Sequence, residues 1–205
     1  MLTPRTRRRA GALLPRGLAP CLLVAALASA GCGSGGSSAP RSATDLVNFQ
    51  LGPEYSHWLL GAISRMATPQ EVQEYLALTD DFAAVDFIEG FWARRDPDPA
   101  DRGNPARRAF EERAAEADRM YSEGGILGRR TARGTIHVVY GEPAEIEYEI
   151  APEGGEPIVV WKYPPDAPPG LDGRSPERFY WFRKVGELTR FYQRRPQRPV
   201  RPINP

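Results

Sequence analysis

The first half of the chain carries apolar residues at helical spacing. The run Thr68-Pro69-Gln70-Glu71 predicts a helix start, because Thr caps a helix, Pro fits its first position and Glu completes a capping box. We expect this helix to continue to about Leu76 and to bury Val72, Tyr75 and Leu76.

A second helix is predicted to begin at Asp80 or Asp81 and to stop at Arg95-Asp96-Pro97-Asp98-Pro99. Its apolar stripe is Phe82, Val85, Ile88 and Trp92, widened by Ala84, Phe87 and Phe91. Because large aromatic residues dominate protein cores, we expect Trp92 to be buried where the helices meet a sheet.

A third helix starts at Asn104-Pro105 and ends before Gly124-Gly125. One of its faces carries Phe110, Ala114, Ala117 and Tyr121. A fourth helix is expected within Glu54 to Met66.

After Gly134 the apolar period changes from 3.6 to 2, which indicates strands. The first predicted strand carries Ile136, Val138 and Tyr140, and the next alternates Ile146, Tyr148 and Ile150 with Glu145, Glu147 and Glu149. Three more strands are expected at 157–163, 178–184 and 188–193. The fold class is therefore α+β, with three to four N-terminal helices packed on an antiparallel sheet of four to five strands.

Residues 1–31 have the pattern of a secretory signal. They contain five arginines and no acid, followed by an apolar run of 13 residues, Leu18 to Ala30. A permanent membrane-spanning helix needs roughly 20 apolar residues, so a single-pass anchor is the less favoured alternative. The cluster Arg7-Arg8-Arg9 is a weak indication of a twin-arginine signal.

The sequence Ala30-Gly31-Cys32 resembles the lipobox of bacterial lipoproteins, in which the Cys becomes the lipidated amino terminus. Ser29 stands where the lipobox usually has Leu, so ordinary cleavage after Ala28 or Ala30 is the alternative. We predict that Cys32 carries lipid and anchors the protein in a membrane. By resemblance to lipoprotein sorting, Gly33 indicates the outer membrane, facing the periplasm.

Three further segments follow the signal. Residues 32–43 form a Gly/Ser tether, residues 44–193 a single domain, and residues 194–205 an Arg/Pro-rich tail that we expect to be disordered. The whole chain has a net charge of +1, with 27 basic and 26 acidic residues, which argues against a nucleic-acid partner. With Cys21 removed and Cys32 lipidated, no thiol is left for a disulfide or a metal.

The domain resembles the GWxTD-domain family of bacterial envelope proteins. The resemblance rests on Phe91-Trp92-Ala93-Arg94-Arg95-Asp96-Pro97, the following helix, Gly128 to Ile136, and Val139-Tyr140-Gly141-Glu142-Pro143. Gly128 and Thr131 match the signature, whereas Arg129 and Ala132 replace its Trp and Asp. The resemblance implies an envelope lipoprotein and carries over no activity.

Three polar clusters are candidates for chemistry. His137 with Glu147 and Glu149 would form a metal site if the three converged. The strand glutamates Glu145, Glu147 and Glu149 would supply a carboxylate pair for acid/base work, since residues two apart share a face. Arg94 and Arg95 would bind an acid of the sheet or of a partner, or simply offset a helix dipole. For each cluster we favour the structural interpretation, and we expect no cofactor.

Aromatic residues on neighbouring predicted strands give the candidate partner surface, which is Trp161, Tyr163, Tyr180 and Trp181. A flat aromatic patch of this kind would suit an envelope protein or a glycan. The sequence thus predicts a membrane-tethered, non-enzymatic binding or scaffold module. The alternative is a carboxylate-dependent hydrolase that acts on envelope polymers.

Overall fold

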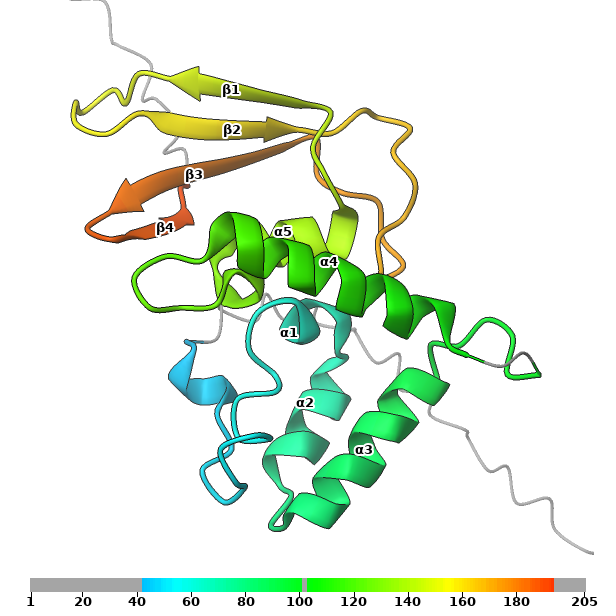
Figure 1. Cartoon of the computed structure of the whole chain (residues 1–205). Coiled ribbons are helices and arrows are strands. Elements are labelled where there is room, and N and C mark those ends of the chain that lie inside the picture. Colours follow the sequence, from blue (N-terminus) through cyan, green and yellow to red (C-terminus); the bar gives the residue numbers. More distant parts are fainter. Residues whose placement is uncertain (1–41, 101–102, 194–205) are drawn as a thin grey trace, which may run out of the picture. The chain divides into compact units, whose positions relative to one another are not determined.

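Helices precede strands in the part of the chain that the computed structural model describes, residues 42–100 and 103–193 (Figure 1). The helices are α1 (Ala62–Met66), α2 (Pro69–Leu76), α3 (Asp81–Ala93), α4 (Pro105–Tyr121) and α5 (Ala132–Tyr140), with short 3-10 turns η1 (Thr44–Leu46) and η2 (Gly128–Arg130). The strands are β1 (Glu145–Glu149), β2 (Ile158–Lys162), β3 (Phe179–Val185) and β4 (Leu188–Phe191). The predicted α+β class is confirmed. The signal-like segment, nearly all of the tether and the tail lie outside the described residues.

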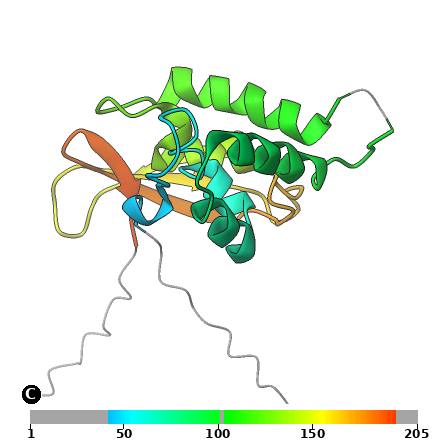
Figure 2. The ribbon, with the colours of Figure 1, turned by 90° about the horizontal axis from the view of Figure 1, so that it is seen from below.

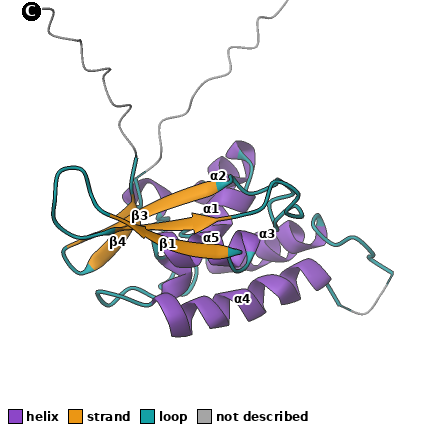
Figure 3. Cartoon of the chain, turned by 90° about the horizontal axis from the view of Figure 1, so that it is seen from above, coloured by secondary structure: helices purple, strands orange, loops and turns teal. Residues whose placement is uncertain are grey.

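The sheet is an antiparallel meander in the order β1-β2-β3-β4. Figure 1 shows α4 and α5 below one face of this sheet, with α1, α2 and α3 beyond them. The view from above shows the strands in front of the helices (Figure 3), and the view from below shows the helices in front of the strands (Figure 2). One hydrophobic core runs from the helices to the covered face of the sheet; its largest members include Tyr75, Phe91, Trp92, Trp161 and Phe182.

The predicted starts of α2, α3 and α4 are confirmed. Thr68 Oγ1 accepts a hydrogen bond from the Glu71 N–H and Glu71 Oε2 accepts one from the Thr68 N–H, so the capping box is complete. The side chain of Asp80 caps α3, and that of Asn104 caps α4.

The expected stripe of α3 is only partly right. Ala84, Phe91 and Trp92 are buried, but Phe82 and Val85 are exposed, because the helix is rotated so that its buried face centres on Ala84 and Phe91. Trp92 is buried as predicted. Its ring partners, however, are Phe91 and Phe110 of α3 and α4, so this tryptophan packs between helices.

The helix expected between Glu54 and Met66 is limited to α1. The preceding residues form turns closed by bonds such as Trp58 N–H to Tyr55 O, and Gly61 separates them from the helix. Gly61 has a φ of +74°, and a Cβ there would lie 2.4 Å from the carbonyl oxygen of Arg129. This close approach to the chain before α5 requires glycine.

The strand predicted over Ile136 to Tyr140 is wrong, because this segment is α5. Thr131 caps the helix by accepting a hydrogen bond from the Gly134 N–H, and the helix is buried from Gly134 to Val139. A short helix that is buried through most of its length shows no clear polar face, so Ile and Val at alternate positions imitate a strand.

Candidate functional site

The candidate partner surface is largely wrong. Trp161, Tyr163 and Tyr180 are buried in the main core, and only Trp181 of the four lies on the outer face of the sheet. The register explains the difference, since Trp161 pairs with Tyr180 and therefore shares its face, whereas Trp181 pairs with Val160. The ring of Trp161 packs 5.5 Å from that of Tyr121 in α4, which places this face against the helices.

Trp181 belongs to a small second cluster on the outer face of the sheet. Ala151, Ile158 and Val160 are buried there, and Phe179, Trp181 and Tyr192 are partly buried beside them. The chain therefore covers much of this face with its own residues. Trp181 alone does not make the flat aromatic patch that the sequence predicted.

Arg94 and Arg95 bind a carboxylate inside the domain. Arg95 donates to both oxygens of Glu71, at 3.0 and 2.7 Å, and also to the Met66 and Phe91 carbonyls. Arg94 donates to Glu71 Oε1 at 2.9 Å. These hydrogen bonds, that of Arg95 above all, lower the pKa of the buried Glu71 to about 2. The pair joins α2 to α3, so its role is structural.

The proposed metal cluster does not form. His137 lies on α5, fully buried, with Nε2 2.9 Å from Glu116 Oε2, whereas Glu147 and Glu149 lie on β1. Over residues 42–100 and 103–193, no group of three or more His, Cys, Asp or Glu side chains is placed to hold a metal ion. The structure therefore places His137 in the core.

The strand glutamates lie together, as the alternation predicted, but Lys162 binds them. Its ammonium group contacts Glu147 and lies 3.3 Å from Glu145 Oε2. The hydrogen bond from Lys162 lowers the pKa of Glu147, which keeps this carboxylate ionised. An acid catalyst needs a raised pKa, so the arrangement does not favour the carboxylate chemistry considered above.

The two matching residues of the GWxTD-like signature pack helices together. A Cβ on Gly128 would lie 1.8 Å from the Ala117 carbonyl oxygen, so η2 reaches α4 only with glycine at this position. Thr131 caps α5, and Arg129, which replaces the signature Trp, donates to both oxygens of Asp118 on α4. The motif therefore holds α4 and α5 against each other.

An exposed apolar row on β1 is the feature that the sequence analysis missed. Ile146 is 47% exposed, Tyr148 72% and Ile150, just beyond the strand, 92%. β1 is an edge strand that pairs with β2 on one side only. Position in the chain did not reveal this edge, because the strand wrongly predicted over Ile136 to Tyr140 made residues 145–149 the second strand rather than the first.

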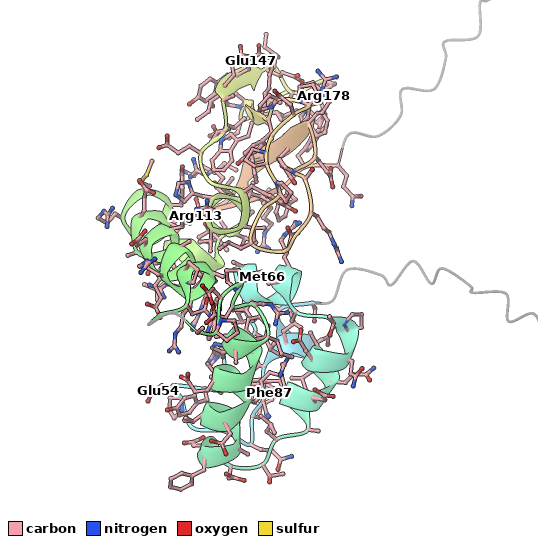
Figure 4. All side chains as sticks on the ribbon, turned by 90° about the vertical axis from the view of Figure 1, so that its right-hand side faces the viewer. Glu54, Met66, Phe87, Arg113, Glu147 and Arg178 are labelled. Atoms are coloured by element: carbon pink, nitrogen blue, oxygen red, sulfur yellow. The ribbon has the colours of Figure 1, made fainter. Side chains whose placement is uncertain are left out.

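The opposite edge of the sheet is capped at Thr189. Glu123, in the loop after α4, accepts hydrogen bonds from the N–H and the hydroxyl of Thr189 on β4, at 2.7 and 2.8 Å. Phe191 of the same strand packs against Phe182, and Arg65 lies over its ring. β1, at the other edge, carries the more exposed apolar side chains, and Figure 4 shows Glu147 of β1 at the far end of the domain from Phe87.

None of the described helices has both the length and the apolar composition to cross a membrane. No family model, no curated protein and no solved structure matches the chain.

Proposed function

We propose that the chain is a membrane-tethered envelope lipoprotein that works as a non-enzymatic binding module, and that β1 is its binding edge. The observation that carries this proposal is the exposed apolar row Ile146, Tyr148 and Ile150 on an open edge strand. Exposed apolar side chains on a sheet edge mark an interaction site, because an edge also offers unpaired N–H and C=O groups.

The form of binding that suits this edge is strand addition. An extended segment of another envelope protein would continue the ladder beyond β1 and cover its apolar row. The main chain supplies hydrogen bonds in this mode, and alternate side chains supply selectivity. At the β4 edge, Glu123 already occupies the N–H and the hydroxyl of Thr189, which favours β1 for such addition.

The tether supports the membrane part of the proposal. Lipidated Cys32 would hold the chain on the bilayer, and residues 32–43 would connect it to the domain. A Gly/Ser tether of about a dozen residues has a typical reach of about 20 Å, which keeps the binding edge near membrane-bound partners. Membership of the GWxTD-domain family is part of the same proposal, resting on the motif residues from Phe91 to Pro143.

Site-specific photocrosslinking tests this function. A photoreactive residue replaces Tyr148 in the full chain, within membranes of the producing cell, and the matched control carries it at Phe82, which is 86% exposed on α3. We expect Tyr148 to give an adduct that mass spectrometry maps to one extended segment of one envelope protein. The double variant Ile146→Ser/Ile150→Ser should weaken the adduct. Identical adducts from Tyr148 and Phe82, or none from Tyr148, would overturn the proposal.

A further inference from the structure

We propose that the segment added to β1 is an extended strand in which basic and apolar side chains alternate. This inference rests on the proposed function of the β1 edge and names the chemistry of its partner. It follows from the two rows of side chains that β1 presents, one on each face of the sheet.

The two faces of β1 differ completely in polarity. Glu145, Glu147 and Glu149 point to the outer face, because they pair with Lys162, Val160 and Ile158. Ile146 and Tyr148 pair with Trp161 and Val159 and point to the helix-facing side. Side chains of an added strand would lie next to these rows in the same alternation, about 4.5–5.5 Å away.

The acidic row favours cations in the added strand. Lys162 is the basic residue directly paired with this row, and it contacts the row from the β2 side. Glu145 and Glu147 therefore share one ammonium group. Opposite charges across a ladder stabilise strand pairing, and like charges destabilise it. Lys or Arg at alternate positions of the partner would complement this row.

The apolar row requires apolar residues between those cations. Tyr148 is 72% exposed and Ile150, just beyond the strand, 92%. An added strand that placed Val, Ile or an aromatic residue next to Ile146 and Tyr148 would remove apolar surface from water. A partner that was basic at every position would leave this surface uncovered.

Two occupants from this chain itself fit poorly. If β1 paired antiparallel with β1 of a second copy in one continuous sheet, the glutamate rows would meet on the same face and repel each other. In the tail, Pro196, Pro199, Pro202 and Pro205 recur at every third position. Proline has no N–H to donate to a ladder, and a period of three does not match the period of two that β1 presents.

Peptide binding to the full chain in detergent micelles tests the partner chemistry. The labelled probes are about eight residues long, near the length of a strand. One alternates Lys with Val, the second alternates Glu with Val, and the third has the Lys/Val composition with the two residues in separate blocks. Fluorescence anisotropy measures each dissociation constant at low and at raised salt.

We expect the alternating Lys/Val peptide to bind at least about tenfold more tightly than the other two, with an affinity that falls as salt rises. The triple variant Glu145→Gln/Glu147→Gln/Glu149→Gln should lose this preference. The matched control Glu74→Gln/Glu89→Gln/Glu111→Gln removes three exposed helical carboxylates and should keep it.

The outcomes separate the two proposals. The proposed basic partner would be wrong if the basic and acidic alternating peptides bound equally, or if the preference were unchanged in the β1 triple variant. Neither result would contradict strand addition itself. If the peptide with Lys and Val in separate blocks binds as tightly as the alternating one, the proposed alternation of basic and apolar residues is wrong. If no peptide binds while the Tyr148 crosslink maps to an extended segment, the partner chemistry is wrong. If that crosslink is also absent, the proposed function fails.

Discussion

The carboxylate of Glu123 accepts a hydrogen bond of 2.7 Å from the backbone N–H of Thr189, although 66 positions separate the two residues in sequence. The contact closes one edge of the sheet with a side chain from the helical half of the domain. It also makes the two edges unequal, since β1 pairs with β2 alone and carries the more exposed apolar side chains. The asymmetry between these edges is the basis of the proposed function.

Glu123→Ala should destabilise the domain by about 1–3 kcal/mol, because it leaves the largely buried Thr189 N–H without its acceptor. The measurement is urea unfolding of the two proteins. The control is Glu111→Ala, which removes an exposed ion pair with Arg107 and should change stability by about 0.5 kcal/mol or less. Equal stability of the two variants would contradict the closed-edge interpretation.

The Glu71 cluster predicts a pH dependence of stability. The pKa of Glu71 is about 2 in the folded chain, below its ordinary value of 4.5, chiefly because Arg95 donates to its carboxylate. As pH falls, Glu71 therefore binds a proton in the unfolded chain at a higher pH than in the folded chain. The stabilisation is complete above pH 4.5 and is lost as pH falls towards 2. Its size is about 2–3 kcal/mol.

Unfolding of the wild type and of Glu71→Gln at a series of pH values measures this contribution. The variant should be less stable at neutral pH, and its stability should change less between pH 4.5 and 2. Glu74→Gln, at an exposed position of the same helix, is the control and should follow the wild type. Parallel curves for wild type and Glu71→Gln would show that Glu71 keeps its ordinary pKa.

Local chemistry made much of the fold predictable. The helix starts at Thr68, at Asp80 or Asp81, and at Asn104-Pro105 were predictable, because a cap depends on residues within one helical turn. Local patterns did not predict the helix over Ile136 to Tyr140, since burial of a helix removes the polar face that distinguishes it from a strand. Tertiary packing decided that element.

The candidate site was less predictable than the fold. Whether Trp161 or Trp181 faces outward depends on which face the helices cover, and the alternation of a strand does not specify that. The partner of Arg95 proved to be Glu71, 24 positions earlier, because α2 and α3 pack side by side. Likewise, the exposure of Tyr148 depends on tertiary packing, which the alternation of a strand does not specify.

Trp92→Ala should cost about 3–5 kcal/mol, because the buried ring packs against Phe91 and Phe110 and its removal leaves a cavity. Thermal unfolding measures the loss. Phe82→Ala in the same helix is the control, and its exposed side chain should contribute about 0.5 kcal/mol or less. Equal melting temperatures of the Trp92→Ala and Phe82→Ala proteins would show that the assigned buried face of α3 is wrong.

Cys32→Ser should release the protein from membranes or stop its processing, because the acylated thiol is the proposed anchor. Cell fractionation measures the distribution, and intact-mass analysis of the wild type should find an amino terminus at Cys32 with acyl chains attached. Cys21→Ser is the matched control and should leave the protein in the membrane. An unmodified terminus after Ala28 or Ala30 would contradict lipidation.

Hydrogen exchange at the two sheet edges tests the central claim most directly. In the free full chain, the amides of β1 that face away from β2 should exchange fast, and the amide of Thr189 should be protected by Glu123. Addition of the alternating Lys/Val peptide should slow the exchanging β1 amides by about tenfold or more and leave Thr189 unchanged. Exchange at β1 that is already slow in the free chain, or peptide-induced protection confined to β4 or the helices, would contradict the account.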